Sequence, residues 1–401
     1  MSVSSSIYKP LKGIMFIIVI ALFEKNLLFS ETFYSPTWGF KISPPAGYTY
    51  SGGDGKYRFS FNFENRAPAY LDLRIYEDNH YTSIETLGKE IQKRIASTGE
   101  ISGFTYQERQ ALLMELHFSL NGKQMHGWGL CVELEDRGSS QRPILAALAY
   151  GDATIKELDN FNLSALDSIV PTKGDELAPG PVSVYAFPGQ ESVATQLAGL
   201  SASAMIDPEA AQACKATVDR EFSILSAYGK DSLWKEAWIR FYQIIYRDSY
   251  SRLSDIAFAV ERDISKSLDA ETRTTSQRDR LFAERTLAWV QQFTYERDLL
   301  GSDFVDLVSA ATEGRGDCDS RAMLWAIILR HNNIPSAIMV SRDYSHAMGL
   351  AQLEGPGARF STGSGDSEQT WIVAETTAQV PLGLIGKSVA DPLKWIPVLF
   401  E

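Results

Sequence analysis

The chain has 401 residues, of which 44% are hydrophobic and 22% are charged, so it can build several hydrophobic cores. This composition excludes a disordered protein. The net charge is -12, and because an acidic surface repels phosphate backbones we expect no nucleic-acid partner.

The first segment of the chain has the pattern of an export signal. Lys9 and Lys12 precede an apolar run, residues 13–23, that is too short for a comfortable bilayer span. We therefore predict a signal peptide over residues 1–30 and an exported protein, periplasmic or extracellular. The alternative is an uncleaved anchor through residues 13–29, and only in that case do we expect association with a membrane.

Residues 31–175 have the pattern of one α/β domain built on an antiparallel sheet. The local signals are alternating aromatic residues at 57–63, a helix capped by Ser83, a hairpin turning at Asn121-Gly122, and a strand at 143–150 followed by a helix at 163–170. This order of helix, sheet and helix is similar to that of the PsbP-like α/β/α sandwich.

Three histidines lie in this domain, His80, His117 and His126. No Cys and His residues stand at the spacing of a metal motif, so we expect ordinary surface or strand histidines. We expect neither a metal nor a cofactor anywhere in the chain. The cysteines are odd in number, so at least one thiol is unpaired; no spacing supports a disulfide between Cys131 and Cys214.

Residues 172–190 are rich in proline and glycine, which is typical of a linker. They open a predicted linker and helical segment, residues 176–270. Within it, apolar and aromatic residues between Trp234 and Ile245 recur at helical spacing, and we expect this stripe to pack into a core.

The stretch "EGRGDCDSRAMLWAIILRHNNIP", residues 313–335, places Cys318 in the first turn of a helix that is apolar on nearly all sides. Asp317 can cap this helix. The unpaired N–H groups of the first turn and the helix dipole favour a thiolate at Cys318. The charges of Asp317 and Asp319 oppose that effect unless both side chains point to solvent, where charge is screened.

The strands after this helix carry a histidine and a carboxylate. His346 begins the second strand of a hairpin, and Glu375 follows a strand beyond the loop of residues 354–370. A symmetric pairing places His346 opposite Glu375 and makes two apolar pairs on the same face. These pairs are Met348 with Val373 and Leu350 with Trp371. If that face packs on the cysteine helix, Cys318, His346 and Glu375 meet as nucleophile, general base and orienting acid.

Residues 275–401 resemble the transglutaminase-like superfamily of papain-fold cysteine enzymes. The resemblance rests on "GDCDSRAMLWAIILRHNNIPSAIMV", "SHAMGL" and "WIVAETT", and on the upstream "WVQQFTY". It implies that Cys318 is the nucleophile, His346 the general base and acid, and Glu375 the orienting acid, where Asp is commoner in the superfamily. We therefore expect an α+β chain whose last part, residues 271–401, is a papain-like transglutaminase core.

The resemblance also implies an oxyanion site and a cover. The backbone N–H of Cys318 is the expected oxyanion donor, with Gln291, Gln292 or Tyr295 as side-chain helpers. The two glutamines are equally consistent with plain helix-surface residues. The loop of residues 354–370 has the length of an enlarged hairpin that could cover the site.

The implied chemistry is acyl transfer through a thioester on Cys318, with a protein or peptide carboxamide as substrate. Water as the acceptor makes a cysteine peptidase or amidase, and an amine makes a cross-linking transglutaminase. Exported relatives favour the hydrolase, although the sequence leaves both open. The main alternative is a catalytically inactive exported scaffold or protein-binding module. Residues 315–317 also spell Arg-Gly-Asp, an adhesion signal that arises easily by chance.

Overall fold

The computed structural model describes residues 32–63, 67–77, 81–138, 141–271, 274–297 and 302–400. The predicted signal peptide and His80 lie outside these ranges. The described chain is mixed α+β, with a large antiparallel sheet and several helices, which confirms the predicted class at that level. None of its described helices is both long and apolar enough to cross a membrane.

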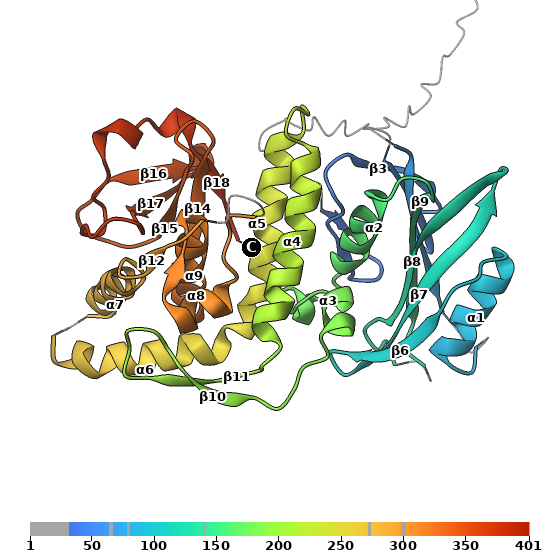
Figure 1. The fold of residues 1–401 in the computed structure, drawn as a ribbon, viewed down its shortest axis with the longest axis horizontal. Coiled ribbons are helices and arrows are strands. Elements are labelled where there is room, and N and C mark those ends of the chain that lie inside the picture. The colour runs from blue at the N-terminus through green and yellow to red at the C-terminus, as the bar shows by residue number, and fades with distance from the viewer. Residues whose placement is uncertain are drawn as a thin grey trace, which may run out of the picture.

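A large antiparallel sheet fills the first part of the chain. Its strands, in spatial order, are β3 (Tyr48–Gly53), β4 (Arg58–Phe63), β5 (Ala69–Tyr76), β9 (Ile144–Asp152), β8 (Lys123–Glu133), β7 (Arg109–Leu120) and β6 (Ile101–Tyr106). A short pair, β1 (Phe33–Tyr34) with β2 (Lys41–Ile42), lies outside it. Helix α1 (Ile84–Arg94) covers one face of the sheet and α2 (Leu158–Asp167) covers the other (Figure 1).

The local signals of this region are largely confirmed. The alternating phenylalanines of β4 point into the core shared with α2, because successive side chains leave a strand on opposite faces. Ser83 caps α1, and Asn121 and Gly122 both adopt positive φ in the β7–β8 turn. The helix predicted at 163–170 instead begins at Leu158 and ends at Asp167.

Residues 172–190, predicted as a linker, are folded, and residues 178–183 among them are buried. They contain η1 (Lys173–Asp175) and α3 (Pro181–Ala186). The reason is the carboxylate at the end of α2: Oδ1 of Asp167 accepts the backbone N–H groups of Val182 and Ser183, each at 2.9 Å.

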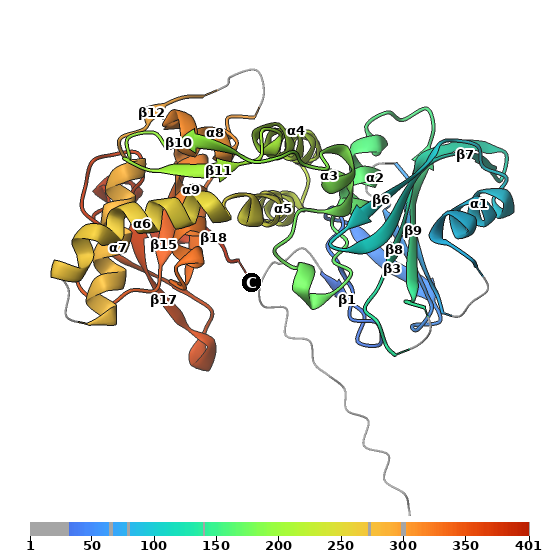
Figure 2. The same cartoon turned by 90° about the horizontal axis from the view of Figure 1, so that it is seen from below.

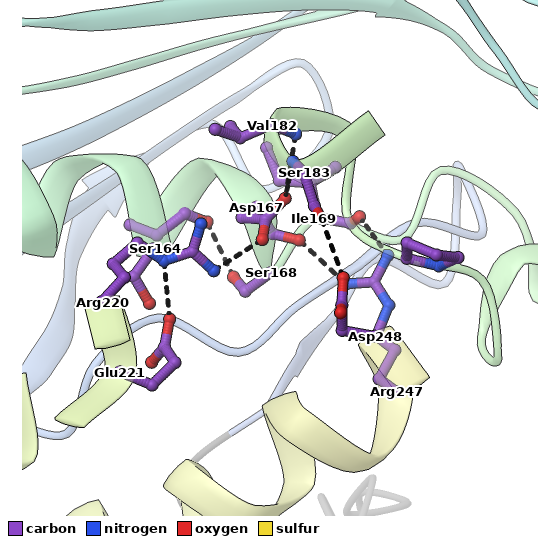
Figure 3. Close-up of polar contacts among 12 residues, drawn as sticks. Ser164, Asp167, Ser168, Ile169, Val182, Ser183, Arg220, Glu221, Arg247 and Asp248 are labelled. Atoms are coloured by element: carbon purple, nitrogen blue, oxygen red, sulfur yellow. Dashed lines mark hydrogen bonds and ion pairs between the residues drawn. The ribbon is translucent and has the colours of Figure 1, made fainter. Parts of the chain in front are cut away.

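A buried polar network joins this segment to the next helices (Figure 3). Oδ2 of Asp167 accepts a hydrogen bond from Arg220 at 2.6 Å. Arg247 donates to the backbone carbonyl oxygens of Asp167 at 3.0 Å and Ile169 at 2.9 Å. Because both arginines belong to the following helices, the network fastens the first sheet to the helical part of the molecule.

Those helices form the centre of the molecule. Helices α4 (Ala210–Ala227) and α5 (Trp234–Arg252) pack side by side between the first sheet and the C-terminal part (Figures 1 and 2). They are followed by α6 (Ser254–Glu271), α7 (Thr275–Val290) and α8 (Leu307–Glu313). A hairpin of β10 (Val193–Gln196) and β11 (Ser203–Ile206) packs against α6. The predicted aromatic stripe lies on α5, and Phe241 and Tyr242 are buried in the core.

The C-terminal part places a sheet against a buried helix, α9 (Cys318–His331). The strands, in spatial order, are β16 (Arg359–Thr362), β17 (Gln369–Ala374), β15 (His346–Ala351), β14 (Ser336–Ser341) and β18 (Ile396–Val398). Two short strands, β12 (Thr294–Tyr295) and β13 (Arg315–Gly316), pair in parallel beside the start of α9. Three short turns of 3-10 helix complete the region: η2 (Gly365–Ser367), η3 (Lys387–Val389) and η4 (Pro392–Lys394).

The predicted register of β15 and β17 is wrong by two residues. Leu350 pairs with Val373 and not with Trp371. An even shift keeps each side chain on its face of the sheet. His346 and Glu375 therefore stay on one face as diagonal neighbours beyond the last paired residues.

The prediction of which face of the sheet packs on the cysteine helix is also wrong. The large residues of the predicted pairs form a separate core with Trp395, whereas alternate residues such as Ala347 and Ala374 share the core of α9. A Cβ at Gly349 would lie 2.5 Å from the ring of Trp325. Small residues thus let the helix approach the sheet, and the bulkier face is covered by the C-terminal segment.

Candidate active site

The turn before α9 is held by reciprocal hydrogen bonds. Oδ1 of Asp317 accepts the N–H of Ser320 at 2.8 Å, and Oγ of Ser320 accepts the N–H of Asp317 at 3.0 Å, so the predicted cap is confirmed. The buried guanidinium of Arg321 donates to the carbonyl oxygens of Gly316 at 3.0 Å and Phe293 at 2.7 Å. These bonds tie the cysteine turn to the end of α7.

An imidazole and a carboxylate meet at the start of β15. Nε2 of His346 lies 2.8 Å from Oε2 of Glu375, and Oε1 of Glu375 accepts from the N–H and hydroxyl of Thr377 at 2.8 and 2.6 Å. Burial raises the pKa of Glu375, but the hydrogen bond and charge of His346 and the bonds from Thr377 lower it overall. An ionised Glu375 holds a proton on Nε2 of His346 and leaves Nδ1 as the other ring atom for proton exchange.

Cys318 is 7% exposed, and its sulfur lies at the same end of the sheet. It lies near the backbone N–H of Ala347, the residue after His346, which acts to lower the pKa of the thiol. It also donates to Oδ1 of Asp319 at 3.1 Å, and Asp319 interacts electrostatically with His346. The structure therefore gathers Cys318, His346 and Glu375 around the first residues of β15. Of these three side chains, those of His346 and Glu375 are in direct contact.

The two acids beside the sulfur do not point to solvent. Asp317 is buried, and Oδ2 of Asp319 accepts the hydroxyl of Tyr242. Burial, followed by the charges of Asp319 and Asp317, raises the pKa of Cys318 far above that of an ordinary thiol. Burial and the charge of Asp319 likewise raise the pKa of Asp317 to about 8. The resting cysteine is thus a protonated thiol at neutral pH, because these effects outweigh the helix dipole.

The three predicted oxyanion helpers have different surroundings. Gln291 donates to the backbone carbonyl of Glu375 at 2.8 Å and to a second carbonyl at 2.9 Å, so it braces the strand end. Gln292 donates to its own helix and is exposed. Tyr295 lies near the sulfur, since burial and then the charge of Cys318 raise the pKa of its hydroxyl. Cys318 opens α9, so its backbone N–H has no partner within the helix and stays the first oxyanion candidate.

Two further sequence features have structural explanations. The loop of residues 354–370 contains strand β16, and its tip lies at the start of β17, at the end of that strand away from Glu375, so the tip does not cover the site. In the Arg-Gly-Asp triplet, Arg315 forms an ion pair with Glu296 at 3.1 Å and Asp317 is the buried cap. The triplet is therefore not displayed as an adhesion loop.

Sequence reasoning missed the contact between Tyr242 and Asp319. Tyr242 belongs to the predicted aromatic stripe of α5. Helical spacing alone does not show which side chain of that stripe forms a hydrogen bond to another element. Cys131 and Cys214 are unpaired buried thiols in different cores, so no disulfide joins them.

Comparisons with known proteins find only faint similarities. No protein-family model and no curated protein matches the chain. LpqN, involved in cell envelope biogenesis of Mycobacterium tuberculosis, is 12% identical with a TM-score of 0.28, over 35% of this chain and 90% of LpqN. The cyanobacterial PsbP protein of Synechocystis, CyanoP, is 13% identical with a TM-score of 0.27, over 37% of this chain and 95% of CyanoP. A protein of Bacteroides thetaiotaomicron is 9% identical with a TM-score of 0.25, over 61% of this chain and 80% of that one.

Such scores carry no argument about function. The three similarities support no more than a weak PsbP-like resemblance, and none of them supports a transglutaminase-like C-terminal core.

Proposed function

We propose that the chain is an exported cysteine acyl-transfer enzyme of transglutaminase-like type, with residues 271–401 as a papain-like core. The observation that supports it is the hydrogen bond between His346 and Glu375, with the sulfur of Cys318 near the backbone N–H of the residue after His346. Residues of nucleophile, base and acid type lie at a helix start and at two strand ends near one end of the C-terminal sheet, although none of the similar structures described above supports such a core.

The proposed reaction starts from a thiol. As the sulfur of Cys318 bonds to the carbonyl carbon of a peptide or carboxamide, its proton passes to Nδ1 of His346. The tetrahedral intermediate collapses, the C–N bond breaks, and the amine leaves with that proton. Water or a second amine then attacks the thioester, His346 takes its proton, and the C–S bond breaks to restore the thiol. Glu375 stays ionised and stabilises the imidazolium throughout.

The test is mass spectrometry of the purified protein with a peptide library and a primary amine. We expect hydrolysed or amine-linked peptides, no product with Cys318→Ala, and a loss of about 10²-fold or more with His346→Ala because general acid–base catalysis is removed. Cys214→Ala is the matched control, since that thiol is buried in a core and should leave turnover unchanged. Absence of any product dependent on Cys318 would contradict the proposal.

A second candidate is a catalytically inactive exported scaffold or protein-binding module. The observation in its favour is the raised pKa of Cys318, because a buried thiol donating to Asp319 is a poor resting nucleophile. In that case the wild type and Cys318→Ala give identical peptide spectra. Export itself rests on residues 1–30, and N-terminal sequencing of the secreted product tests it.

A further inference from the structure

Three polar side chains converge on the β7–β8 hairpin of the first sheet, far from the cysteine along the chain. Glu115 and His117 lie two residues apart on β7 and so project from the same face. His126 on β8 is paired directly opposite His117. Oε1 of Glu115 lies 3.0 Å from Nε2 of His117 and 3.4 Å from Nε2 of His126. The two imidazole rings stack with their centroids 4.7 Å apart.

These separations match those of donors around one metal ion. Two bonds of about 2.0–2.1 Å at a tetrahedral angle place their donor atoms roughly 3.3 Å apart. The three donor atoms of this cluster all lie within 4.8 Å of one another. Two imidazoles and a carboxylate form a common donor set for Zn²⁺, with the fourth position left to water or an external ligand. The side chain of His117 is 47% exposed, so that position is open to solvent.

A further carboxylate fixes the orientation of His126. Nδ1 of His126 lies 2.7 Å from Oδ1 of Asp159, in the first turn of α2. A carboxylate at this distance keeps a proton on Nδ1, and the lone pair of Nε2 then faces the oxygen of Glu115. This is the carboxylate–histidine arrangement that orients zinc ligands.

The backbone under the cluster is held on both sides. The N–H of Glu115 donates to the carbonyl of Glu100 at 3.0 Å, and the N–H of His117 donates to the carbonyl of Thr98 at 2.9 Å. On its other side β7 is paired with β8 from Ala111 to Leu120. The donor atoms can therefore be brought onto an ion by small side-chain rotations alone.

We propose that Glu115, His117 and His126 form a Zn²⁺ site, with Asp159 as the positioning residue for His126. Hard cations such as Ca²⁺ and Mg²⁺ prefer all-oxygen sites, so we expect them not to compete. This site is independent of the proposed acyl-transfer reaction, because its residues lie on the first sheet and on α2.

Calorimetric titration with ZnCl₂ of the full mature chain, free of affinity tags, tests the proposal. The measurement uses the Cys318→Ala variant, because the thiol between Asp317 and Asp319 is the other group of metal-binding type among the described residues. We expect binding of one ion per chain in this background. His117→Ala and His126→Ala should each weaken it at least tenfold, and Asp159→Asn should weaken it about 10- to 100-fold through the lost orientation.

His331→Ala is the matched control, because His331 bonds to the carbonyl of Tyr250 and should leave zinc binding unchanged. His117 is well exposed, so its variant is expected to fold, and a circular dichroism spectrum equal to that of the parent verifies this. Absence of zinc binding in the Cys318→Ala background overturns the proposal. So does binding that His117→Ala and His126→Ala leave unchanged, since the cluster would then be an ion pair held by protons.

Discussion

At the scale of single residues, the protonation state of the thiol decides how Cys318 reacts. Its hydrogen bond to Asp319 and its burial keep the proton on sulfur, so an enzyme of this kind would remove that proton during attack and not before it. A nucleophile of this type depends on the imidazole for each turnover. Asp319 is thus a residue whose charge opposes activation in the resting state.

The Asp319→Asn variant tests this reading of the thiol. The change removes the charge nearest the sulfur, lowers the pKa of Cys318, and raises the thiolate fraction about tenfold for each unit of that decrease. We therefore expect faster alkylation of Cys318 by iodoacetamide at pH 8, read by mass spectrometry. Cys131 is the internal control, because burial alone raises its pKa to about 12 and its modification should not change. An unchanged or slower rate at Cys318 would refute the electrostatic explanation.

At the scale of elements, the approach of α9 to β15 depends on one glycine. A Cβ at position 349 would lie 2.5 and 2.6 Å from two ring carbons of Trp325. That ring is fully buried and its Nε1 donates to the carbonyl of Ala283 at 3.1 Å, so it cannot turn away. The contact sets the distance between the helix that carries the cysteine and the strand that carries the histidine.

We expect Gly349→Ala to destabilise the C-terminal part by about 1–3 kcal/mol, because overpacking forces the helix and the strand apart. The measurement is the midpoint of urea unfolding followed by tryptophan fluorescence. Gly52→Ala is the control, since no atom lies within 4 Å of its Cβ position, and its midpoint should stay level or rise slightly. Equal midpoints for Gly349→Ala and the wild type would show that the contact relaxes freely.

At the scale of the whole molecule, the buried network around Asp167 connects the first sheet to the central helices (Figure 3). Burial raises the pKa of Asp167, but the charge of Arg220 and the hydrogen bonds lower it overall. A carboxyl whose folded pKa is depressed stabilises the fold above its unfolded pKa. That contribution is lost as the pH falls from about 4 through the folded value.

We expect Asp167→Asn to lower stability at pH 7 by about 3–5 kcal/mol, because Arg220 is left buried with less compensating charge. Below about pH 4 the difference from the wild type should shrink, since the native carboxyl is then protonated as well. Thermal unfolding across this pH range measures both effects. Asp219→Asn, at an exposed ion pair with Lys215, should change little at any pH. A constant difference at every pH would exclude the ionic origin.

Much of the local structure could be predicted from the sequence. The caps at Ser83 and Asp317, the Asn121-Gly122 turn and the buried character of α9 depend on residues only a few positions apart, and all are confirmed. The choice of Cys318, His346 and Glu375 as candidates came from residue type and order. The structure places all three at one end of the C-terminal sheet, and their catalytic roles stay predictions.

Only the tertiary structure decided which faces and which distant groups meet. Alternation along β15 groups its side chains into two sets, but the sequence does not show that the small set covers α9. The burial that keeps Cys318 protonated depends on helices α5 and α9 together. The pairing of His117 with His126 depends on a hairpin register, and the Asp159 that contacts His126 comes from a helix further along the chain. Local signals reflect near neighbours, whereas burial, pKa and ligand geometry depend on packing between distant segments.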